Sequence, residues 1–450
     1  MLKKILLFAG SFLAAIILLW SALILTSLVP NEAIKDNLLS SALSLNGADP
    51  FFQPAGRNTV TDNYADVILL NVILNIDSEN PVVSSLDTKY YDGNDGVTDY
   101  GENYGLYAAL NGAEPNTDYS RYWHGSAVFI RPLLAVTDLS GIRLIGAVFA
   151  LILLAVNCAL LIKRKHYPQA AALVLSLVCV QAWNIRLAME YQPAVLVTLA
   201  VLTFFILLEK KGDTALIVLS VISGVLIAFF DFLTAETLTI LVPLIIVLSI
   251  RFSEGRFSGA KAELLRSVKC SAGWLLAYCG TFLAKWTAAS LATGENKFTA
   301  ALTSAEERFG GSFSEMSTIE QIFAAPFTNI STMFGAAERG ELLNGIIGAV
   351  ILLSAAALIL YLSRKKKAAL GFIITVLILG AVPYLRYGVL SNHSYLHDFF
   401  TYRAQAAAVL ALVTGAIAGL QKEKKKEKEK KGAKSGKGKK GKKKRAANGA

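Results

Sequence analysis

Residues 214–250 read TALIVLSVISGVLIAFFDFLTAETLTILVPLIIVLSI, and this stretch decides the fold class. It contains two apolar runs, 214–230 and 234–250, in which Asp231 and Glu236 are the only charged residues of the whole stretch. Each run approaches the roughly 20 residues that a helix needs to cross the hydrocarbon core of a bilayer. The stretch therefore predicts two membrane-spanning helices joined by a short turn.

Similar charge-poor apolar runs recur along the chain. Hydrophobic residues make up 54% of the sequence and charged residues 17%, against roughly 45–50% and about 25% in ordinary soluble domains. Ten runs approach spanning length: 5–29, 141–162, 169–185, 193–208, 214–230, 234–250, 271–291, 343–362, 368–385 and 404–420. The sequence therefore predicts an all-α polytopic membrane protein with about ten transmembrane helices, in one transmembrane domain over residues 1–420.

The net charge of +11 is unevenly distributed. Residues 421–450 contain fifteen Lys and Arg against three Glu, so this tail holds the whole positive excess. Elsewhere, basic residues cluster after every second apolar run, for example at residues 163–165 and 210–211, and such clusters accumulate on the cytoplasmic side. We therefore expect a multi-pass protein of a cell membrane with both termini in the cytoplasm. The tail composition predicts a disordered polybasic segment that contacts anionic lipid rather than nucleic acid.

Two long loops, 30–140 and 293–341, fall on the outer side in this arrangement, and loops of this length usually carry function. All four cysteines lie in or beside predicted helices, so we expect no disulfide in these loops and favour a bacterial membrane. The acidic stretch YDGNDGVTDYGE, residues 91–102, does not have the spacing of an EF-hand loop and favours a solvated turn. No nucleotide-binding motif occurs, so no cofactor is expected, and a divalent cation is unsupported.

The segment SRYWHGSAVFIRPLL, residues 120–134, precedes the second predicted helix. Its composition is typical of a short helix in the membrane interface, with Trp123 at the level of the lipid headgroups. The alternative is a wall that binds the phosphate of a lipid-linked substrate through Arg121, His124 and Arg131.

The segment SNHSYLHDFFTYR, residues 391–403, lies at the outer end of the last predicted helix. His393 and His397 are four residues apart and would share a helical face, but a zinc-protease motif needs a glutamate beside the first histidine, where a serine stands. We therefore predict no metal site. The segment favours phosphate or sugar binding that involves both histidines, Tyr402 and Arg403, with capping of the last helix as the alternative.

Four stretches over roughly residues 3–250 resemble the GT-C superfamily of membrane glycosyltransferases, which includes protein mannosyltransferases and the lipid A aminoarabinose transferase; uncharacterised bacterial members are the most similar. TDNYADVILLNVIL (61–74) is similar to the first outer loop of that superfamily, and NIRLAMEYQPAVL (184–196) to its second. HGSAVFIRPLLAVTDLSGIRLIGAVFALILL (124–154) resembles the juxtamembrane helix and second span, in which Arg143 matches the family arginine. GVLIAFFDFLTAETLTILVPLIIV (224–247) looks like the fifth and sixth spans.

The resemblance implies an inverting enzyme that moves a sugar from a polyprenyl-phosphate donor to an extracytoplasmic glycan, lipid or protein acceptor. It places the catalytic base at Asp62, although Asn63 departs from the acidic neighbour usual in the family. Asp66, one helical turn later, is the alternative base, and Glu190 would hold the acceptor or orient a cation. The candidates for binding the donor phosphate are Arg131, Arg186, His393 and Arg403.

Such an enzyme requires Asp62 and Glu190 to converge on one outer cavity with an arginine nearby. A helix N-cap is the structural alternative for Asp62. Three charged residues in or beside predicted spans, Lys285, Asp231 and Glu236, should face a cavity or each other, because a charge exposed to lipid costs several kcal/mol. Two other functions stay open: a carrier or flippase for a lipid-linked or anionic solute, and a non-catalytic scaffold for envelope assembly.

Overall fold

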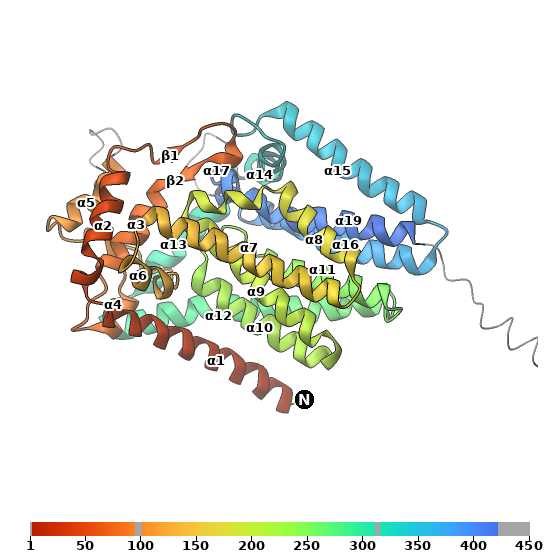
Figure 1. Ribbon diagram of the computed structural model, residues 1–450, viewed down its shortest axis with the longest axis horizontal. Helices are drawn as coiled ribbons and strands as arrows, with labels where there is room; N and C mark the ends of the chain where they lie inside the picture. Colours follow the sequence, from red (N-terminus) through yellow and green to blue (C-terminus); the bar gives the residue numbers. More distant parts are fainter. Residues whose placement is uncertain (1, 95–100, 311–315, 422–450) are drawn as a thin grey trace, which may run out of the picture.

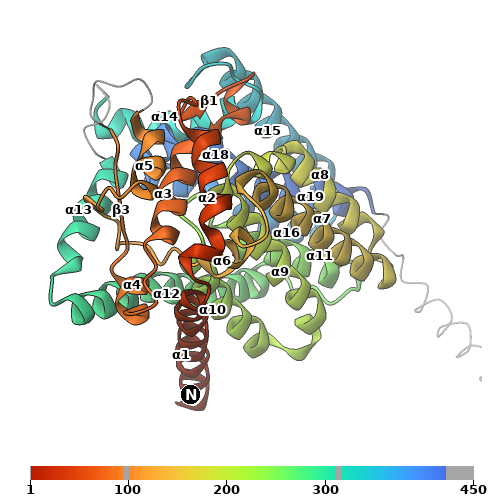
Figure 2. The ribbon, with the colours of Figure 1, turned by 60° about the vertical axis from the view of Figure 1, so that its left-hand side comes forward.

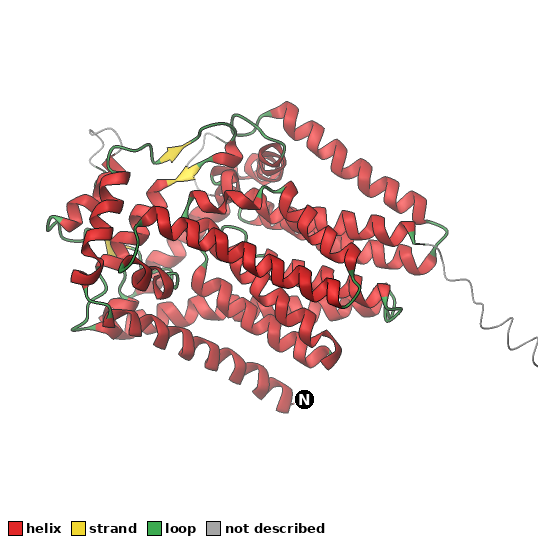
Figure 3. Cartoon of the chain, viewed as in Figure 1, coloured by secondary structure: helices red, strands yellow, loops and turns green. Residues whose placement is uncertain are grey.

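The computed structural model describes residues 2–94, 101–310 and 316–421. Helices form most of these ranges, and the strands within them are two-residue segments (Figure 3). They pair antiparallel, β1 (Phe51–Phe52) with β2 (Thr61–Asp62) and β3 (Lys89–Tyr90) with β4 (Thr117–Asp118). The all-α fold class is therefore confirmed. The tail predicted to be disordered and the middle of the acidic stretch, residues 422–450 and 95–100, lie outside the described residues.

Seven helical segments within the described ranges are long and apolar enough to cross a membrane, so the chain is a helical membrane protein. They are built around α1 (Leu2–Leu25), α7 (Leu139–Lys163), α9 (Gln192–Leu208), α10 (Asp213–Phe230), α15 (Leu342–Ser363), α16 (Lys367–Val389) and α19 (Ala406–Leu420).

The other three predicted spans form helices that do not meet this standard. Both α8 (Tyr167–Cys179) and α11 (Leu238–Ser253) are shorter, and α12 (Ala260–Thr293) is long but carries several charged residues in its first half. The eighth helix ends early because Gln181 adopts a left-handed backbone conformation, with φ +50°. Helix α11 begins late because Leu233, with φ +68°, lies in a turn that continues up to Leu238, the first residue of the helix.

The first long loop folds into a cap at one end of the helical bundle (Figures 1 and 2). Its helices are α2 (Asn31–Leu45), α3 (Asn63–Leu74), α4 (Pro81–Leu86), α5 (Gly101–Leu110) and α6 (Ala127–Leu134). The N-terminus and the end of α19 lie at the opposite end of the bundle (Figure 1). A side-chain contact joins the cap to the C-terminal region: Arg57 Nε donates to the buried Asp398 Oδ2 at 3.2 Å.

The second loop and the end of the chain add shorter helices near the cap. The loop contains α13 (Lys297–Gly310) and α14 (Thr318–Met333), and α17 (Ser391–Leu396) and α18 (Asp398–Thr401) follow α16. Short 3-10 helices occur at η1 (Thr26–Leu28), η2 (Arg57–Thr59), η3 (Ala182–Leu187), η4 (Met189–Tyr191), η5 (Glu209–Lys211) and η6 (Tyr402–Gln405).

Burial separates central helices from peripheral ones. In the most apolar 18-residue stretch of each span, the buried share of the residues is 67% around α9, but 6% in α1 and 17% in α15. The outer helices therefore present apolar side chains on the molecular surface, where a soluble protein rarely has such a large patch but a membrane protein contacts lipid. The four cysteines are free and lie on helices: Cys158, Cys179, Cys270 and Cys279.

The prediction that Trp123 lies at headgroup level is wrong. Its ring is buried 5.3 Å from that of Phe229, and its indole Nε1 donates to the Thr281 carbonyl at 2.8 Å. A tryptophan N–H needs a partner when it is buried, and α12 supplies this one. Phe129, on α6, is exposed, so the amphipathic character of segment 120–134 belongs to the helix and not to the turn before it.

The charged residues in or beside the predicted spans do not pair with one another. Lys285 donates to two backbone carbonyls of α4, at 2.8 and 3.1 Å. Glu236 forms a bidentate ion pair with Arg386, with distances of 2.8 and 3.1 Å, and Asp231 accepts hydrogen bonds from Thr234. Each buried charge therefore has a polar partner: that of Asp231 is three residues away, whereas those of Lys285 and Glu236 lie far away in the sequence.

Candidate functional site

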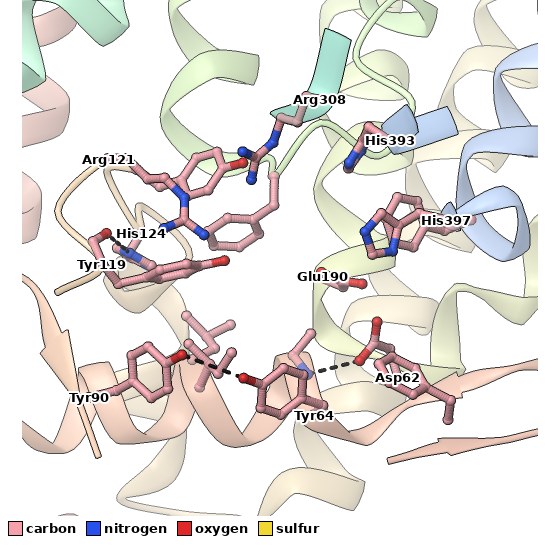
Figure 4. A pocket seen from close by; sticks show the side chains of 17 residues that line it. Asp62, Tyr64, Tyr90, Tyr119, Arg121, His124, Glu190, Arg308, His393 and His397 are labelled. Carbon is pink, nitrogen blue, oxygen red and sulfur yellow. Dashed lines mark hydrogen bonds between the residues drawn. The ribbon is translucent and has the colours of Figure 1, made fainter. Parts of the chain in front are cut away.

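A cavity of about 270 Å³ lies between the cap and the bundle (Figure 4). Its walls come from β1, β2 and α3 of the cap, from the turn before α6, and from η4, α13 and α17. Segments far apart in the sequence therefore meet there. Its acidic and basic lining residues are Asp62, Arg121, His124, Glu190, Arg308, His393 and His397.

Asp62 is both the N-cap of α3 and part of the cavity wall. Its Oδ1 accepts a hydrogen bond from the Ala65 backbone N–H at 2.9 Å. Its side chain is buried and faces the Glu190 carboxyl (Figure 4). Burial raises the pKa of Asp62 to about 6, against the lowering effects of Glu190 and the Ala65 N–H. A carboxyl with this pKa can accept a proton near neutral pH.

Glu190 lies opposite Asp62 because η4 brings the second short outer loop against α3. The Met189 N–H donates to Asp66 Oδ1 at 2.8 Å, which fixes this loop beside the first turn of α3. Asp62 and Glu190 thus converge on one cavity with arginines nearby, as the enzyme interpretation requires.

Asp66, the alternative base, does not line the cavity. It is fully buried, and Arg143 Nε donates to its Oδ2 at 2.7 Å while its Oδ1 accepts from Met189. Arg143 also donates to Asn63 Oδ1 at 2.9 Å. Both carboxylate oxygens of Asp66 are therefore occupied, and the residue ties α3 to α7 and η4.

Two guanidinium groups, those of Arg121 and Arg308, line the cavity on the side away from Asp62 (Figure 4). Arg121 lies 4.2 Å from the ring centroid of Tyr119, and Arg308 lies 5.8 Å from that of Tyr122. Neither forms an ion pair with a carboxylate of the described residues. Unpaired guanidiniums in a cavity suit an anionic ligand such as a phosphate.

Several lining side chains have buried polar atoms without a hydrogen-bond partner in the part of the chain that the structure describes. Such atoms are uncommon in folded proteins, and those that line a cavity are available to hydrogen-bond a ligand. They are Arg121 Nε, His124 Nδ1, Glu190 Oε1, Arg308 Nε and His397 Nδ1.

The three histidines of the cavity are neutral at physiological pH. Burial lowers the pKa of His124 and of His397 to about 3, and it lowers that of His393 as well. His393 Nε2 lies 3.0 Å from the Leu233 carbonyl, and His124 Nε2 lies 3.1 Å from the Tyr119 carbonyl. These imidazoles can therefore hydrogen-bond a ligand but do not neutralise a phosphate by charge.

The acidic and histidine side chains of the cavity do not form a metal-ligand cluster among the described residues. The cluster that the structure does bring together is Asp87, Asp118 and Glu295, outside the cavity. The Lys297 ammonium lies among these three carboxylates, at 2.9, 2.5 and 2.8 Å. A lysine thus supplies the positive charge there.

Besides Asp66, four residues of the predicted site lie outside the cavity. Arg131 is buried and donates to the Val29 carbonyl at 3.0 Å, so it anchors α6. Arg186 is exposed on η3. Arg403 and the adjacent Tyr402 are buried near Tyr191, whose ring centroid lies 4.5 Å from the guanidinium.

The resemblance had pointed to Tyr64; the residues that sequence reasoning missed are Arg308 and the other tyrosines of the cavity, Tyr90, Tyr119 and Tyr122. Arg308 follows no motif, and only the position of α13 over the cavity reveals its role. Arg121 lies in segment 120–134, which the sequence offered as a possible phosphate-binding wall, so its place in the sequence did indicate its position in the site.

An apolar groove of about 550 Å³ continues from the cavity between α11, α12, α13 and α16. The cavity and the groove share three lining residues, Arg121, Tyr122 and Arg308. A second apolar groove, of about 320 Å³, lies between α6, α7, α9 and α10 and shares no lining residue with the cavity.

Comparisons with protein-family models, with curated proteins and with solved structures find no match to this chain. Its function is therefore inferred from the site. The site combines a carboxyl that can act as a base, two cations without carboxylate partners, and an apolar route that ends at those cations.

Proposed function

We propose that the protein is a membrane glycosyltransferase of the GT-C kind, which transfers a sugar from a polyprenyl-phosphate donor to an extracytoplasmic acceptor. One observation carries this proposal. Asp62 and Glu190 face Arg121 and Arg308 across a cavity that continues into an apolar groove. Sugar transfer from a lipid phosphate needs a base, a phosphate site and a place for the lipid chain, and this arrangement offers all three.

The chemical step follows from the positions of these groups. Asp62 accepts the proton of an acceptor hydroxyl, and the acceptor oxygen forms a bond to the anomeric carbon of the donor sugar. The bond between that carbon and the phosphate oxygen breaks, and its electron pair leaves with the polyprenyl phosphate. Arg121 and Arg308 stabilise the departing negative charge. Attack from the side opposite the phosphate inverts the anomeric centre, and Glu190 holds the acceptor.

The apolar groove suits the polyprenyl chain. Its walls include Trp274, Tyr278 and Phe282 of α12 and aliphatic residues of α11 and α16. A chain in this groove would bring its phosphate to Arg121 and Arg308, which stand where the groove meets the cavity. The donor would thus reach the site from the membrane, and no nucleotide site is needed.

We also propose an orientation for this membrane protein. Basic residues at the ends of α7 and α9, at positions 163–165 and 210–211, favour the cytoplasm. The cap and the cavity would then lie outside a bacterial cell membrane, with both termini inside. The polybasic tail would contact anionic lipid of the inner leaflet.

The proposal is tested by comparing two aspartates that both cap helices. Asp62 caps α3, and Asp138 caps α7 by accepting from the Gly141 N–H at 3.2 Å, away from the cavity. Asparagine also caps helices, so Asp62→Asn and Asp138→Asn both keep the cap. Purified protein in lipid nanodiscs is supplied with radiolabelled polyprenyl-phosphate sugars and a membrane extract as acceptor. We expect Asp62→Asn to lower the transfer rate by about a hundred- to ten-thousand-fold, and Asp138→Asn to leave it unchanged.

Transfer by Asp62→Asn at the wild-type rate would contradict the assignment of the base. Counterflow of a sugar lipid in proteoliposomes that lack any acceptor, unchanged in Asp62→Asn, would instead support a carrier. Loss of partner recruitment without any transfer or transport activity would support a scaffold.

A further inference from the structure

One wall of the cavity is aromatic and belongs to the cap rather than to the spans. Phe51 on β1, Tyr64 on α3 and Tyr90 on β3 all line the cavity. Figure 4 shows Tyr64 beside Asp62, and Tyr90 on the far side of Tyr64, below Tyr119 and Arg121. Phe51 and Tyr64 therefore lie at the Asp62 end of the cavity, and neither of them lines the apolar groove.

Two of these rings flank the proposed base. The register of the first strand pair places Phe51 directly opposite Asp62, and Tyr64 follows Asp62 by two residues. The Phe51 and Tyr64 rings meet edge to face, with centroids 6.4 Å apart and planes at 73°. The Tyr64 hydroxyl lies 3.5 Å from the Tyr90 hydroxyl, which fixes the position of this ring.

The positions of the aromatic rings indicate which of them would contact the acceptor and which the donor. A base must contact the acceptor, so rings that flank Asp62 belong to the acceptor side. Tyr119 stacks with Arg121 and belongs to the donor side. Phe51 is 43% exposed, so an acceptor can approach this wall from water.

The chemistry of the wall favours a saccharide over a lipid or a peptide. A pyranose ring packs the C–H groups of one face against an aromatic ring, and its hydroxyls bond tyrosine and carboxyl oxygens. A lipid acceptor lacks a second apolar route, because the groove beside α7 shares no lining residue with the cavity. A bound peptide would need backbone partners, and the adjacent strand pair is only two residues long.

We infer that Phe51 and Tyr64 form an acceptor subsite that binds a saccharide, with a sugar hydroxyl directed at Asp62. As an acceptor site it rests on the proposed transferase function. The binding of a sugar there is measurable without any transfer.

The experiment exploits the alternation of side chains along β1. Phe51 lines the cavity, whereas its neighbour Phe52, 52% exposed, does not, because successive residues of a strand point to opposite sides. Binding of neutral gluco-, galacto- and manno-trisaccharides to the full-length protein in nanodiscs is measured by saturation-transfer NMR and titration. Phe51→Leu and Tyr64→Leu should weaken binding of the preferred trisaccharide by about tenfold each, while Phe52→Leu should bind it as tightly as the wild type does.

Three outcomes would overturn the inference: no trisaccharide binds the wild type, Phe52→Leu weakens binding as much as Phe51→Leu, or neutral hexapeptides compete equally well. A melting temperature measured for each variant separates loss of the subsite from loss of the fold. If Asp62-dependent transfer proceeds without saccharide binding, the subsite is wrong and the transferase stands. If trisaccharides bind as expected but no polyprenyl-phosphate sugar is consumed, the transferase is wrong and the saccharide site stands.

Discussion

Asp62 has two roles at the start of α3, and they place opposite demands on its charge. As an N-cap it is stabilised by the Ala65 N–H and the positive end of the helix. As a buried group it resists ionisation, and burial outweighs both the cap and the hydrogen bond with Glu190, so its pKa rises to about 6. The residue is thus ionised at neutral pH but still basic enough to accept a proton.

The raised pKa predicts how the transfer rate depends on pH. Below about pH 6, kcat/KM should fall tenfold for each unit of pH, because Asp62 becomes protonated and cannot act as a base. The measurement is the initial rate between pH 4.5 and 8 at limiting donor. The Asp138→Asn profile should superimpose on that of the wild type. A wild-type rate that stays constant down to pH 4.5 would contradict the assignment.

The same pKa predicts a stability effect of Asp62→Asn. The folded state binds the Asp62 proton more tightly than the unfolded state, because the pKa is about 6 rather than 3.8. The protonated carboxyl therefore stabilises the folded state fully below pH 3.8, and this stabilisation is lost as the pH rises through about 6. Asparagine does not ionise, so the melting temperature of Asp62→Asn should exceed that of the wild type at pH 7 by more than at pH 4. An equal difference at both pH values would count against the burial of an ionised Asp62.

At the scale of elements, α13 connects the parts of the site. It places Arg308 where the cavity and the groove meet, and Ala301, Ser304 and Ala305 along the groove. Its first residue, Lys297, fixes it to the cap through Asp87, which precedes β3, and Asp118, which ends β4. Its last turn accepts hydrogen bonds from α17, one of them from Ser391 Oγ to the Phe309 carbonyl at 2.9 Å.

Removal of the Lys297 ammonium should release the start of this helix. In Lys297→Met, three carboxylates lose their common cation; because Asp118 and Glu295 are exposed to water, the loss should cost about 1–3 kcal/mol. Hydrogen exchange at the amides of α13 should accelerate, and the transfer rate should fall because Arg308 is displaced. Lys89→Met is the matched control: Lys89 also pairs with Asp87, but its side chain is 42% exposed, against 5% for Lys297. Equal exchange in both variants would refute this role of Lys297.

The groove along α13 predicts a dependence on the lipid chain. In Ala305→Trp, the indole would occupy space that the polyprenyl chain needs, so the transfer rate from a long-chain donor should fall by about tenfold, or about 1.4 kcal/mol. A donor with a chain of two isoprene units should be affected less. Leu302→Trp is the control, because Leu302 is 55% exposed on the same helix and does not line the groove. If the two donors lose the same fraction of their transfer rate in both variants, the polyprenyl chain does not bind in this groove.

At the scale of the whole molecule, sequence reasoning succeeded where the signal is local. All ten apolar runs form helices, and the apolar segment after Asp62 forms α3. It failed where a side chain meets a distant partner. The guanidinium of Arg131 is used by the backbone near α1, and that of Arg386 by Glu236, 150 residues away in the sequence. Apolar periodicity contains no signal for such contacts, so Arg131 was expected to bind phosphate although the fold uses its guanidinium elsewhere.

The approach of Asp62 and Glu190 was predicted from a resemblance and not from spacing. The two residues belong to different outer loops, and the Asp66 contacts with Met189 and Arg143 bring these loops together. Of the aromatic wall, only Tyr64 was indicated by the resemblance; Phe51, Tyr90 and Arg308 were not predicted, because they become neighbours only when the cap folds over the bundle.

Electron cryomicroscopy of the protein in nanodiscs with a polyprenyl-phosphate sugar tests the central claim most directly. The account predicts the phosphate between Arg121 and Arg308, the chain in the groove between α11, α12 and α16, and the anomeric carbon facing Asp62. A lipid phosphate bound elsewhere, with no density in the cavity or the groove, would contradict it.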